Sequence, residues 1–364
     1  MKKLIFSFSL FCIILIVVAI LDVVFSNTVF SFKKNCYRYD EYYYELKPNC
    51  SSKFEFKNAF PTTDVYTDEN GLRVGKDYQF RDKNKKNILI FGDTFTFGYG
   101  LQYEDTYVGI MEKKLNEYNF YNYAVGSYSP SVHLYKLNKA IKQNILPSKI
   151  FVFLDFTDVL DEAARWNYNH EKNLVFLSSN FLFLNSQKEV SFKKKNFRIL
   201  SEISSLLNSN LRILRSKLEN YLKKNSSNPV RIDTTIHSQF TYISENNLDK
   251  RFWKDQSLQK GLRKIKKNLN EMQTLAKKFS SEFYIVIYPW AETLVYGQKQ
   301  FDWSEFSNDL CSIKECKLID AIPDFEKYKT NNINWNNQLY FVGDFNFNSY
   351  GAKLLSQVVL KHLK

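Results

Sequence analysis

A hydroxyl residue stands directly after a short apolar run and a glycine. Residues 88–91 read Ile-Leu-Ile-Phe, and Gly92, Asp93 and Thr94 follow them. An apolar run that ends in glycine predicts a buried strand that feeds a sharp turn. A hydroxyl at such a turn becomes a nucleophile when a neighbouring base takes its proton. Thr94 is therefore the first candidate for covalent chemistry.

Three further segments follow this one in a fixed order. Residues 122–129 read Asn-Tyr-Ala-Val-Gly-Ser-Tyr-Ser, residues 154–158 read Leu-Asp-Phe-Thr-Asp, and residues 343–351 read Gly-Asp-Phe-Asn-Phe-Asn-Ser-Tyr-Gly. With residues 92–98 they resemble blocks II, III, V and I of the SGNH/GDSL hydrolase family. Block I usually reads Gly-Asp-Ser-Phe-Thr-x-Gly, and block V reads Asp-x-His-x-Asn-x-x-Gly. The resemblance covers roughly residues 60–364.

The resemblance implies a role for each matching position. In the family a serine attacks an ester carbonyl, a histidine activates the serine, and an aspartate orients the histidine. These positions hold Thr94, Asn346 and Asp344 here. The family's oxyanion hole uses backbone N–H groups, the block II glycine and the block III asparagine. The matching residues are Thr94, Ser127 or its neighbour Gly126, and Thr157.

The replaced histidine is the most serious departure from the family pattern. An amide such as Asn346 cannot accept and return a proton near neutral pH, and general-base help is typically worth about 10²–10⁴-fold. Threonine keeps a competent hydroxyl, and Thr157 could still donate a hydrogen bond where asparagine donates an amide. We therefore expect a partly functional oxyanion hole without a working base.

Other side chains could replace the missing base. The four histidines are expected to be surface or packing residues, because the fold fixes the base on the block V loop. A carboxylate near block III is the remaining alternative, although no motif supports it. The histidines are His133, His170, His237 and His362, and the carboxylates are Asp155 and Asp158.

Buried strands alternate with helices along the chain. Strands are predicted at residues 86–92, 150–154 and 283–288, and helices at residues 104–118 and 258–279. This alternation indicates an α/β domain with a mostly parallel sheet. The family resemblance implies a three-layer, flavodoxin-like sandwich.

A basic segment interrupts the predicted domain. Residues 192–224 carry nine Lys/Arg against two Glu, with leucines and isoleucine at helical spacing, inside an insertion at about residues 164–255. The segment fits either a helix on an anionic membrane or acidic polymer, or an ordinary amphipathic helix with a solvated basic face.

The N-terminus predicts a membrane anchor. Lys2 and Lys3 precede an apolar run over residues 4–21, which is long enough to span a bilayer. The lysines should stay in the cytoplasm, so residues 1–27 are expected to be a single-pass anchor. Residues 28–59 are expected to be a stalk, with the domain on the periplasmic side of a bacterial inner membrane.

Cysteine usage agrees with an oxidising compartment. Four cysteines lie outside the anchor, and of three possible connectivities the local pairs Cys36–Cys50 and Cys311–Cys316 are the simplest. Their spacing does not form a zinc pattern, so no metal or cofactor is expected.

Composition bounds the function. The chain has 364 residues, Lys+Arg 51 against Asp+Glu 38, a net charge of +13, and 44% hydrophobic residues, so it can bury a core and is not disordered overall. Nucleic acid is a poor partner for an exported chain.

The leading expectation is a catalytically impaired, membrane-anchored pseudo-hydrolase. It would bind an acylated or cell-envelope carbohydrate ligand or support an envelope-assembly partner. An active esterase or O-acyltransferase using Thr94, and a purely structural anchor on anionic lipid, are the alternatives.

Overall fold

The computed structural model describes residues 36–39, 43–54, 61–177, 258–298, 302–342 and 344–363, together with a helical pair at residues 17–18. Apart from that pair, nearly all described residues belong to one compact unit, residues 34–178 with 231–364. Within these ranges no helix has the length and apolar character that crossing a membrane requires. Most of the predicted anchor and the whole basic segment lie outside the described residues.

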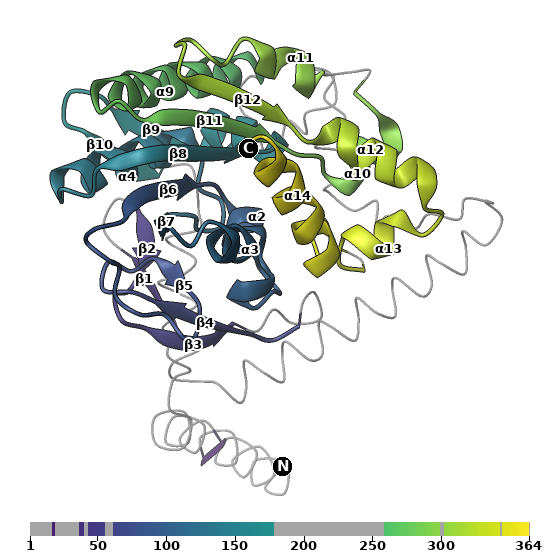
Figure 1. The fold of residues 1–364 in the computed structure, drawn as a ribbon, viewed down its shortest axis with the longest axis horizontal. Coiled ribbons are helices and arrows are strands. Elements are labelled where there is room, and N and C mark those ends of the chain that lie inside the picture. The colour runs from purple at the N-terminus through teal and green to yellow at the C-terminus, as the bar shows by residue number, and fades with distance from the viewer. Residues whose placement is uncertain are drawn as a thin grey trace, which may run out of the picture. The chain divides into compact units, whose positions relative to one another are not determined.

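A five-stranded parallel sheet forms the centre of the domain (Figure 1). Its spatial order is β12-β11-β8-β6-β7. Read from the β7 edge and numbered along the chain, this is 2-1-3-4-5, the flavodoxin-like order. The strands are β6 (Lys86–Phe91), β7 (Tyr118–Asn122), β8 (Pro147–Leu154), β11 (Glu282–Ile287) and β12 (Cys316–Asp320).

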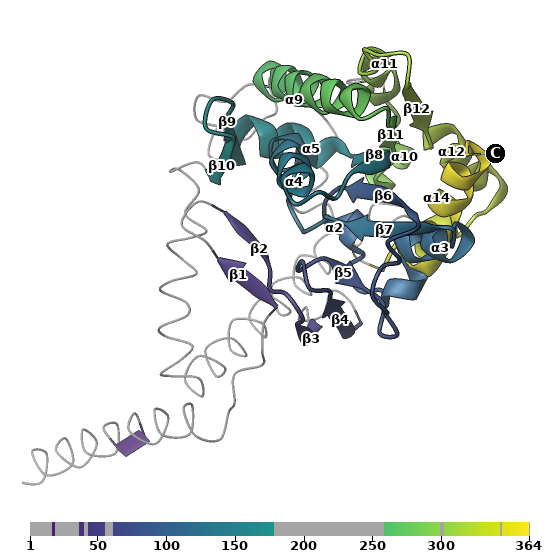
Figure 2. The ribbon, with the colours of Figure 1, turned by 60° about the vertical axis from the view of Figure 1, so that its left-hand side comes forward.

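Helices cover both faces of this sheet (Figure 2). One face packs on α3 (Tyr107–Lys114), α12 (Ile322–Asn331) and α14 (Ser349–Lys361). The other packs on α4 (Pro130–Lys142), α5 (Phe156–Leu160), α9 (Leu258–Lys278) and α11 (Trp303–Asn308). A parallel sheet needs apolar residues on both faces because both are buried. The predicted three-layer α/β sandwich is therefore confirmed.

Short elements connect and flank these layers. The helical ones are α2 (Thr94–Phe97), the 3₁₀ turn η1 (Tyr103–Asp105), the π-helical turn η2 (Asp161–Arg165), α10 (Ala291–Tyr296) and α13 (Trp335–Leu339). The antiparallel strands are β1 (Tyr37–Tyr39) with β2 (Tyr44–Leu46), β9 (Trp166–Asn169) with β10 (Leu174–Leu177), and β3 (Ser51–Phe54) with β4 (Thr63–Thr67) and β5 (Arg73–Val74).

The segment predicted as a stalk is folded onto the domain over its described residues, 36–39 and 43–54. Buried Glu45 pairs with Lys136 and, at 3.2 Å, with Lys139, both on α4. The Tyr44 hydroxyl donates to the Gly126 carbonyl at 2.7 Å. The domain therefore begins before residue 60. The tyrosines and charges of this segment looked like a solvated linker because their partners lie far away in the sequence.

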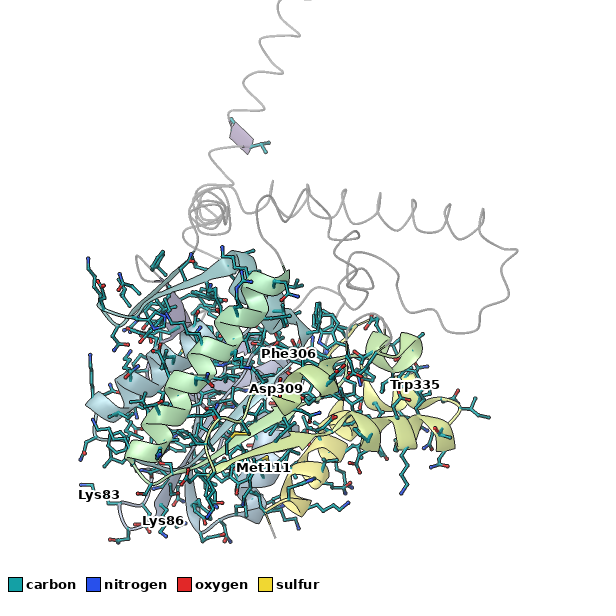
Figure 3. All side chains as sticks on the ribbon, turned by 90° about the horizontal axis from the view of Figure 1, so that it is seen from above. Lys83, Lys86, Met111, Phe306, Asp309 and Trp335 are labelled. Atoms are coloured by element: carbon teal, nitrogen blue, oxygen red, sulfur yellow. A yellow bond between two sulfur atoms is a disulfide. The ribbon has the colours of Figure 1, made fainter. Side chains whose placement is uncertain are left out.

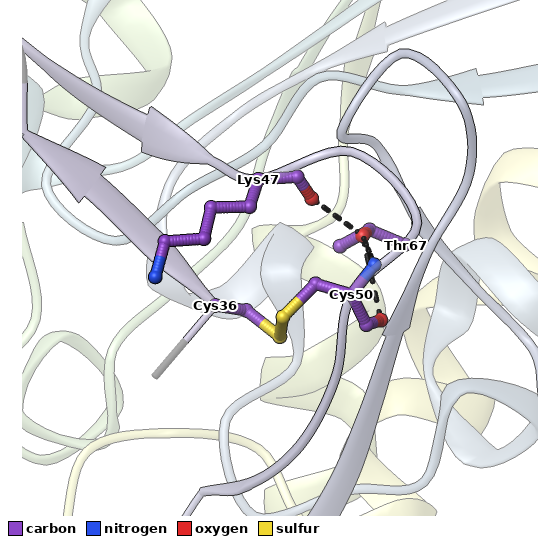
Figure 4. The surroundings of a disulfide bond; sticks show 4 residues. All are labelled: Cys36, Lys47, Cys50 and Thr67. Carbon is purple, nitrogen blue, oxygen red and sulfur yellow. Dashed lines mark hydrogen bonds between the residues drawn. A yellow bond between two sulfur atoms is a disulfide. The ribbon is translucent and has the colours of Figure 1, made fainter. Parts of the chain in front are cut away.

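The predicted disulfides Cys36–Cys50 and Cys311–Cys316 are both present. Figure 4 shows that Thr67 holds the first one in place. The Thr67 hydroxyl accepts from the Cys50 N–H at 2.8 Å and donates to the Lys47 carbonyl at 2.6 Å. The disulfide loop is thus fastened to β4 as well as closed on itself.

Several element boundaries differ from the sequence prediction. The helix expected over residues 104–118 is limited to η1 and α3, and Tyr118 already opens β7. Strand β7 was missed because it reads Tyr-Asn-Phe-Tyr-Asn, and its buried Asn119 is satisfied by the backbone of Asp82. The start of the predicted helical insertion is the β9–β10 hairpin.

Candidate active site

The carboxyl ends of β6, β8 and β11 meet at one edge of the sheet, where flavodoxin-like folds bind ligands. Thr94 opens α2 directly after β6, and the Asp93 carboxylate caps this helix by accepting from the Phe95 N–H at 3.0 Å. A Cβ on Gly92 would lie 1.9 Å from the Thr96 hydroxyl oxygen. Only glycine therefore allows the turn that presents half-buried Thr94.

Arg73 fixes the loop that follows α2. Its fully buried guanidinium donates to the carbonyls of Phe97, Gly98 at 2.9 Å, and Leu101 at 2.6 Å. Gly98 ends the helix with a φ of 83°, a conformation that glycine adopts without strain. Burial lowers the pKa of Arg73 to about 10, so the cation persists at neutral pH and positions the loop.

The two block V residues form a hydrogen-bonded pair. Asp344 accepts from both the backbone N–H and the side-chain amide of Asn346, each at 2.8 Å. Asn346 is 2% exposed, and within the described structure its Oδ1 has no hydrogen-bond partner. The amide reproduces the orienting contact that a histidine would make with Asp344, but it provides no atom that can take a proton.

An aromatic cluster brings block I and block V together. The Phe95 ring lies 4.8 Å from Phe347 and 5.9 Å from Phe345, centroid to centroid. It also contacts Tyr288 at 5.1 Å and Trp290 at 6.2 Å, at the end of β11. Thr94 and Asn346 each neighbour a residue of this cluster in the sequence. The packing therefore places their two segments side by side, as the motif order predicted.

The block II loop is held rigidly around Ser127. Ser127 has a φ of 61°, the left-handed conformation that glycine favours, which agrees with its place at the family's glycine position. Its carbonyl accepts from the Trp166 indole N–H at 2.6 Å. A Cβ on neighbouring Gly126 would lie 2.6 Å from the Tyr99 hydroxyl, so the glycine there permits close packing.

Thr157 uses its hydroxyl differently from the prediction. Its hydroxyl and its backbone N–H, at 2.7 Å, both donate to Asp155 Oδ1, which caps α5. The proton that was expected to serve an oxyanion is therefore committed to the helix cap in this structure.

Three buried carboxyls lie beneath the site, namely Asp93, Asp155 and Asp158. The Tyr288 hydroxyl bridges Asp93 at 3.2 Å and Asp155 at 3.5 Å, and the Trp290 indole donates to Asp155 at 2.9 Å. Burial, followed by repulsion from Asp155, raises the pKa of Asp93 and of Asp158. Asp155 is occupied by these donors, which argues against Asp155 as the alternative base for Thr94. The other predicted alternative, Asp158, accepts from the Asp155 N–H at 2.8 Å through Oδ2, and its Oδ1 has no hydrogen-bond partner in the described structure.

One further carboxyl escaped the sequence reasoning. Glu292 lies in the first turn of α10, two residues after Trp290, and is 4% exposed. Burial and then repulsion from Asp344 raise its pKa. The only sequence signal was a charged residue shortly after a buried strand, which is too common to single it out.

The described histidines do not replace Asn346. Buried His133 lies on α4, with its Nε2 3.3 Å from the Gly92 carbonyl oxygen, and burial lowers its pKa to about 3. His170 pairs with Glu271, and His362 contacts the Val358 carbonyl. His237 lies outside the described residues. No group of three or more His, Cys, Asp or Glu in the described ranges could hold a metal ion.

The loops that carry blocks I and V therefore pack together at the carboxyl edge of the sheet. In Figure 3, Lys83 and Lys86 at the amino end of β6 lie on the opposite side of the domain from Trp335 in α13. The block V loop follows α13 directly.

Solved structures similar to this chain are lipolytic proteins and esterases. A lipolytic G-D-S-L family member from Veillonella parvula is 14% identical over 76% of this chain and 97% of its own, with a TM-score of 0.41. TesA is 12% identical over 77% and 98%, with a TM-score of 0.42. The acetyl xylan esterase AlAXEase is 13% identical over 76% and 100%, with a TM-score of 0.42. No family model and no curated protein matches the sequence. Sequence identities and TM-scores this low do not allow an activity to be transferred to this chain.

Proposed function

We propose that this protein is a membrane-anchored, extracytoplasmic hydrolase-like domain with impaired hydrolysis. It binds an acylated or cell-envelope carbohydrate ligand at the carboxyl edge of its sheet, or it supports an envelope-assembly partner. The observation that carries this proposal is the Asn346–Asp344 pair. The orienting contact is kept, and the proton-accepting nitrogen is replaced by an amide.

The loss is expected to be large but not total. General-base help is worth about 10²–10⁴-fold, whereas positioned backbone donors still stabilise an oxyanion. The disulfides support the extracytoplasmic location, because such bonds persist in oxidising compartments.

The chemical part of the proposal is tested with a fluorophosphonate ester probe on the full chain in detergent, followed by intact mass and peptide mapping. The native chain should label slowly. The double change Asn346→His with Thr94→Ser should label faster by roughly 10²–10⁴-fold. The matched control is Asn331→His, which makes the same change at an exposed position on α12. Rapid ester hydrolysis by the native chain, abolished in Thr94→Ala, would establish the active esterase instead.

The binding part is tested separately. The full chain is titrated calorimetrically with a cell-envelope glycan before and after chemical removal of its acyl groups. Tighter binding of the acylated form is expected, and equal or absent binding of both forms would overturn this part.

A further inference from the structure

Glu292 is a buried carboxyl in the first turn of α10, two residues after Trp290, whose ring contacts residues of blocks I and V. It is 4% exposed, and among the residues that the structure describes its Oε2 accepts and donates no hydrogen bond. Buried polar atoms are nearly always paired, so an unpaired one requires an explanation. A structural role gives none, because leaving a buried carboxyl unpaired destabilises the fold.

Packing ties Glu292 to the block V loop. The rings of Trp290 and Phe345 stack at 4.4 Å with an interplanar angle of 3°. Trp290 caps the helix that contains Glu292, and Phe345 lies between Asp344 and Asn346 in the sequence. The Asp344 charge acts on Glu292 and, with burial, raises its pKa. The same two rings contact Phe95, the residue after Thr94.

The charges around Glu292 do not neutralise it. From the block V side it faces Asp344, and it acts on Tyr340, whose hydroxyl donates to the Pro289 carbonyl at 2.9 Å. On α12, which packs against α10, Glu326 pairs with Lys329 at 3.4 Å, and Lys329 also donates to the Leu294 carbonyl. The site therefore holds a carboxyl that binds a proton more readily than an exposed glutamate does.

We propose that Glu292 is the proton acceptor for Thr94, in the place that Asn346 leaves empty. The Thr94 oxygen attacks an ester carbonyl carbon while its proton passes to the Glu292 carboxylate. When the ester C–O bond breaks, the departing alcohol takes that proton, and an acyl-Thr94 remains. Water or a second alcohol then attacks the acyl group, gives its proton to Glu292 and releases Thr94, which recovers the proton. This slow acyl transfer goes beyond the proposed ligand binding and does not rest on it.

The test measures acylation of Thr94 by p-nitrophenyl acetate in the full chain, as release of p-nitrophenol and as acetyl mass on the Thr94 peptide, from about pH 5 to about pH 9. A carboxylate base predicts a rate that rises with pH and levels off once Glu292 is ionised. Glu292→Gln should lower the rate by roughly 10²-fold or more and remove that rise. Glu292→Asp should restore part of the rate and of its rise with pH. Glu305→Gln, at an exposed position on α11, is the matched control and should behave as the native chain.

Thermal unfolding of each variant separates loss of the base from loss of the fold. A folded Glu292→Gln chain with the native rate and pH profile would overturn the inference, and so would a native chain in which Thr94 is never acylated. The second outcome leaves ligand binding intact. Fast hydrolysis that depends on Glu292 would support this inference and overturn the impaired function, so the two proposals fail separately.

Discussion

Glu162 and Glu292 are both buried glutamates, on opposite faces of the sheet, and their surroundings differ completely. Glu162 is fully buried and accepts from Ser129 Oγ at 2.7 Å, from Ser131 N–H at 2.6 Å and from Ser131 Oγ at 2.7 Å. Lys264 adds its charge at 3.4 Å. Glu292 has one oxygen unpaired in the described structure and a negative neighbour in Asp344.

The difference separates a structural carboxylate from a reactive one. Glu162 holds the first turn of α4 and joins it to α9 through Asn268. Its carboxylate is stabilised by donors at the start of α4 and on α9, namely Ser129, Ser131 and Lys264. The Glu292 carboxyl accepts from its own backbone N–H, whereas its Oε2 has no partner in the described structure. A bound proton therefore contributes to its stabilisation and can be exchanged.

The largest expected effect is at Glu162. Changing Glu162→Ala leaves the buried Ser129 and Ser131 donors without their acceptor and removes the ion pair with Lys264, which keeps only its backbone carbonyl partners. This should lower the free energy of unfolding by about 3–5 kcal/mol. Urea unfolding of the full chain in detergent measures this, with Glu171→Ala at an exposed position as the control. A loss of stability no larger than that of the control would show that Glu162 does not have this structural role.

Replacing Glu292 is expected to raise the stability of the fold, the opposite of the change expected at Glu162. The folded state holds a proton that the unfolded chain releases, because the folded pKa is raised. The native chain therefore loses stability as pH rises above the ordinary glutamate value of 4.5 and through the folded pKa. Glu292→Gln removes this loss and should gain about 1–3 kcal/mol near pH 8, with little change near pH 4. Melting temperatures of the native chain and of Glu292→Gln near pH 4 and near pH 8 test this prediction. Equal shifts at both pH values would contradict it.

Asp93 should behave like Glu292, with a smaller gain on neutralisation because its carboxylate also caps α2. Its folded pKa is raised by burial and by Asp155, so it too makes the protein less stable as pH rises. Asp93→Asn keeps an acceptor for the Phe95 N–H and removes the repulsion. We expect a higher melting temperature at pH 8, by an amount equivalent to about 1 kcal/mol, and a flatter pH dependence. A lower melting temperature at both pH values would show that the carboxylate itself is needed.

The smallest effect is expected at Thr157. Thr157→Val removes the hydroxyl donated to Asp155 and should cost about 0.5–1.5 kcal/mol without altering Thr94 labelling by the fluorophosphonate probe. Thr157→Ser serves as the conservative control. A clear fall in labelling at unchanged stability would return Thr157 to the oxyanion hole.

The sequence predicted the parts of the fold that depend on local apolar runs. Strands β6, β8 and β11 and the long helix α9 stand out because their buried residues are continuous or periodic. Strand β7 and the folded residues 36–39 and 43–54 could not be recognised. Their polar residues are buried only because distant groups, such as Asp82 for Asn119 and Lys136 for Glu45, satisfy them.

The candidate site divides in the same way. Motif order was sufficient to bring Thr94, Asp344 and Asn346 to one edge, since each motif marks the end of a strand or the start of a helix. The direction of the Thr157 hydroxyl and the burial of Glu292 depend on side-chain packing across segments far apart in the chain. Spacing alone carries no information about either.

The early strands β1 and β2 also bear on the order in which this protein folds. Their partners include Tyr99, Tyr128 and Lys136, which lie 62, 84 and 91 residues further along the chain. These strands therefore wait for that length of chain to be synthesised before they can dock. The Cys36–Cys50 loop is short enough to close beforehand, but it cannot dock until α4 is available. Contacts of such long sequence range slow folding, and a waiting tyrosine-rich hairpin is a site for misassembly between chains. Early closure of this disulfide would then limit the time during which the segment can pair with the wrong neighbour.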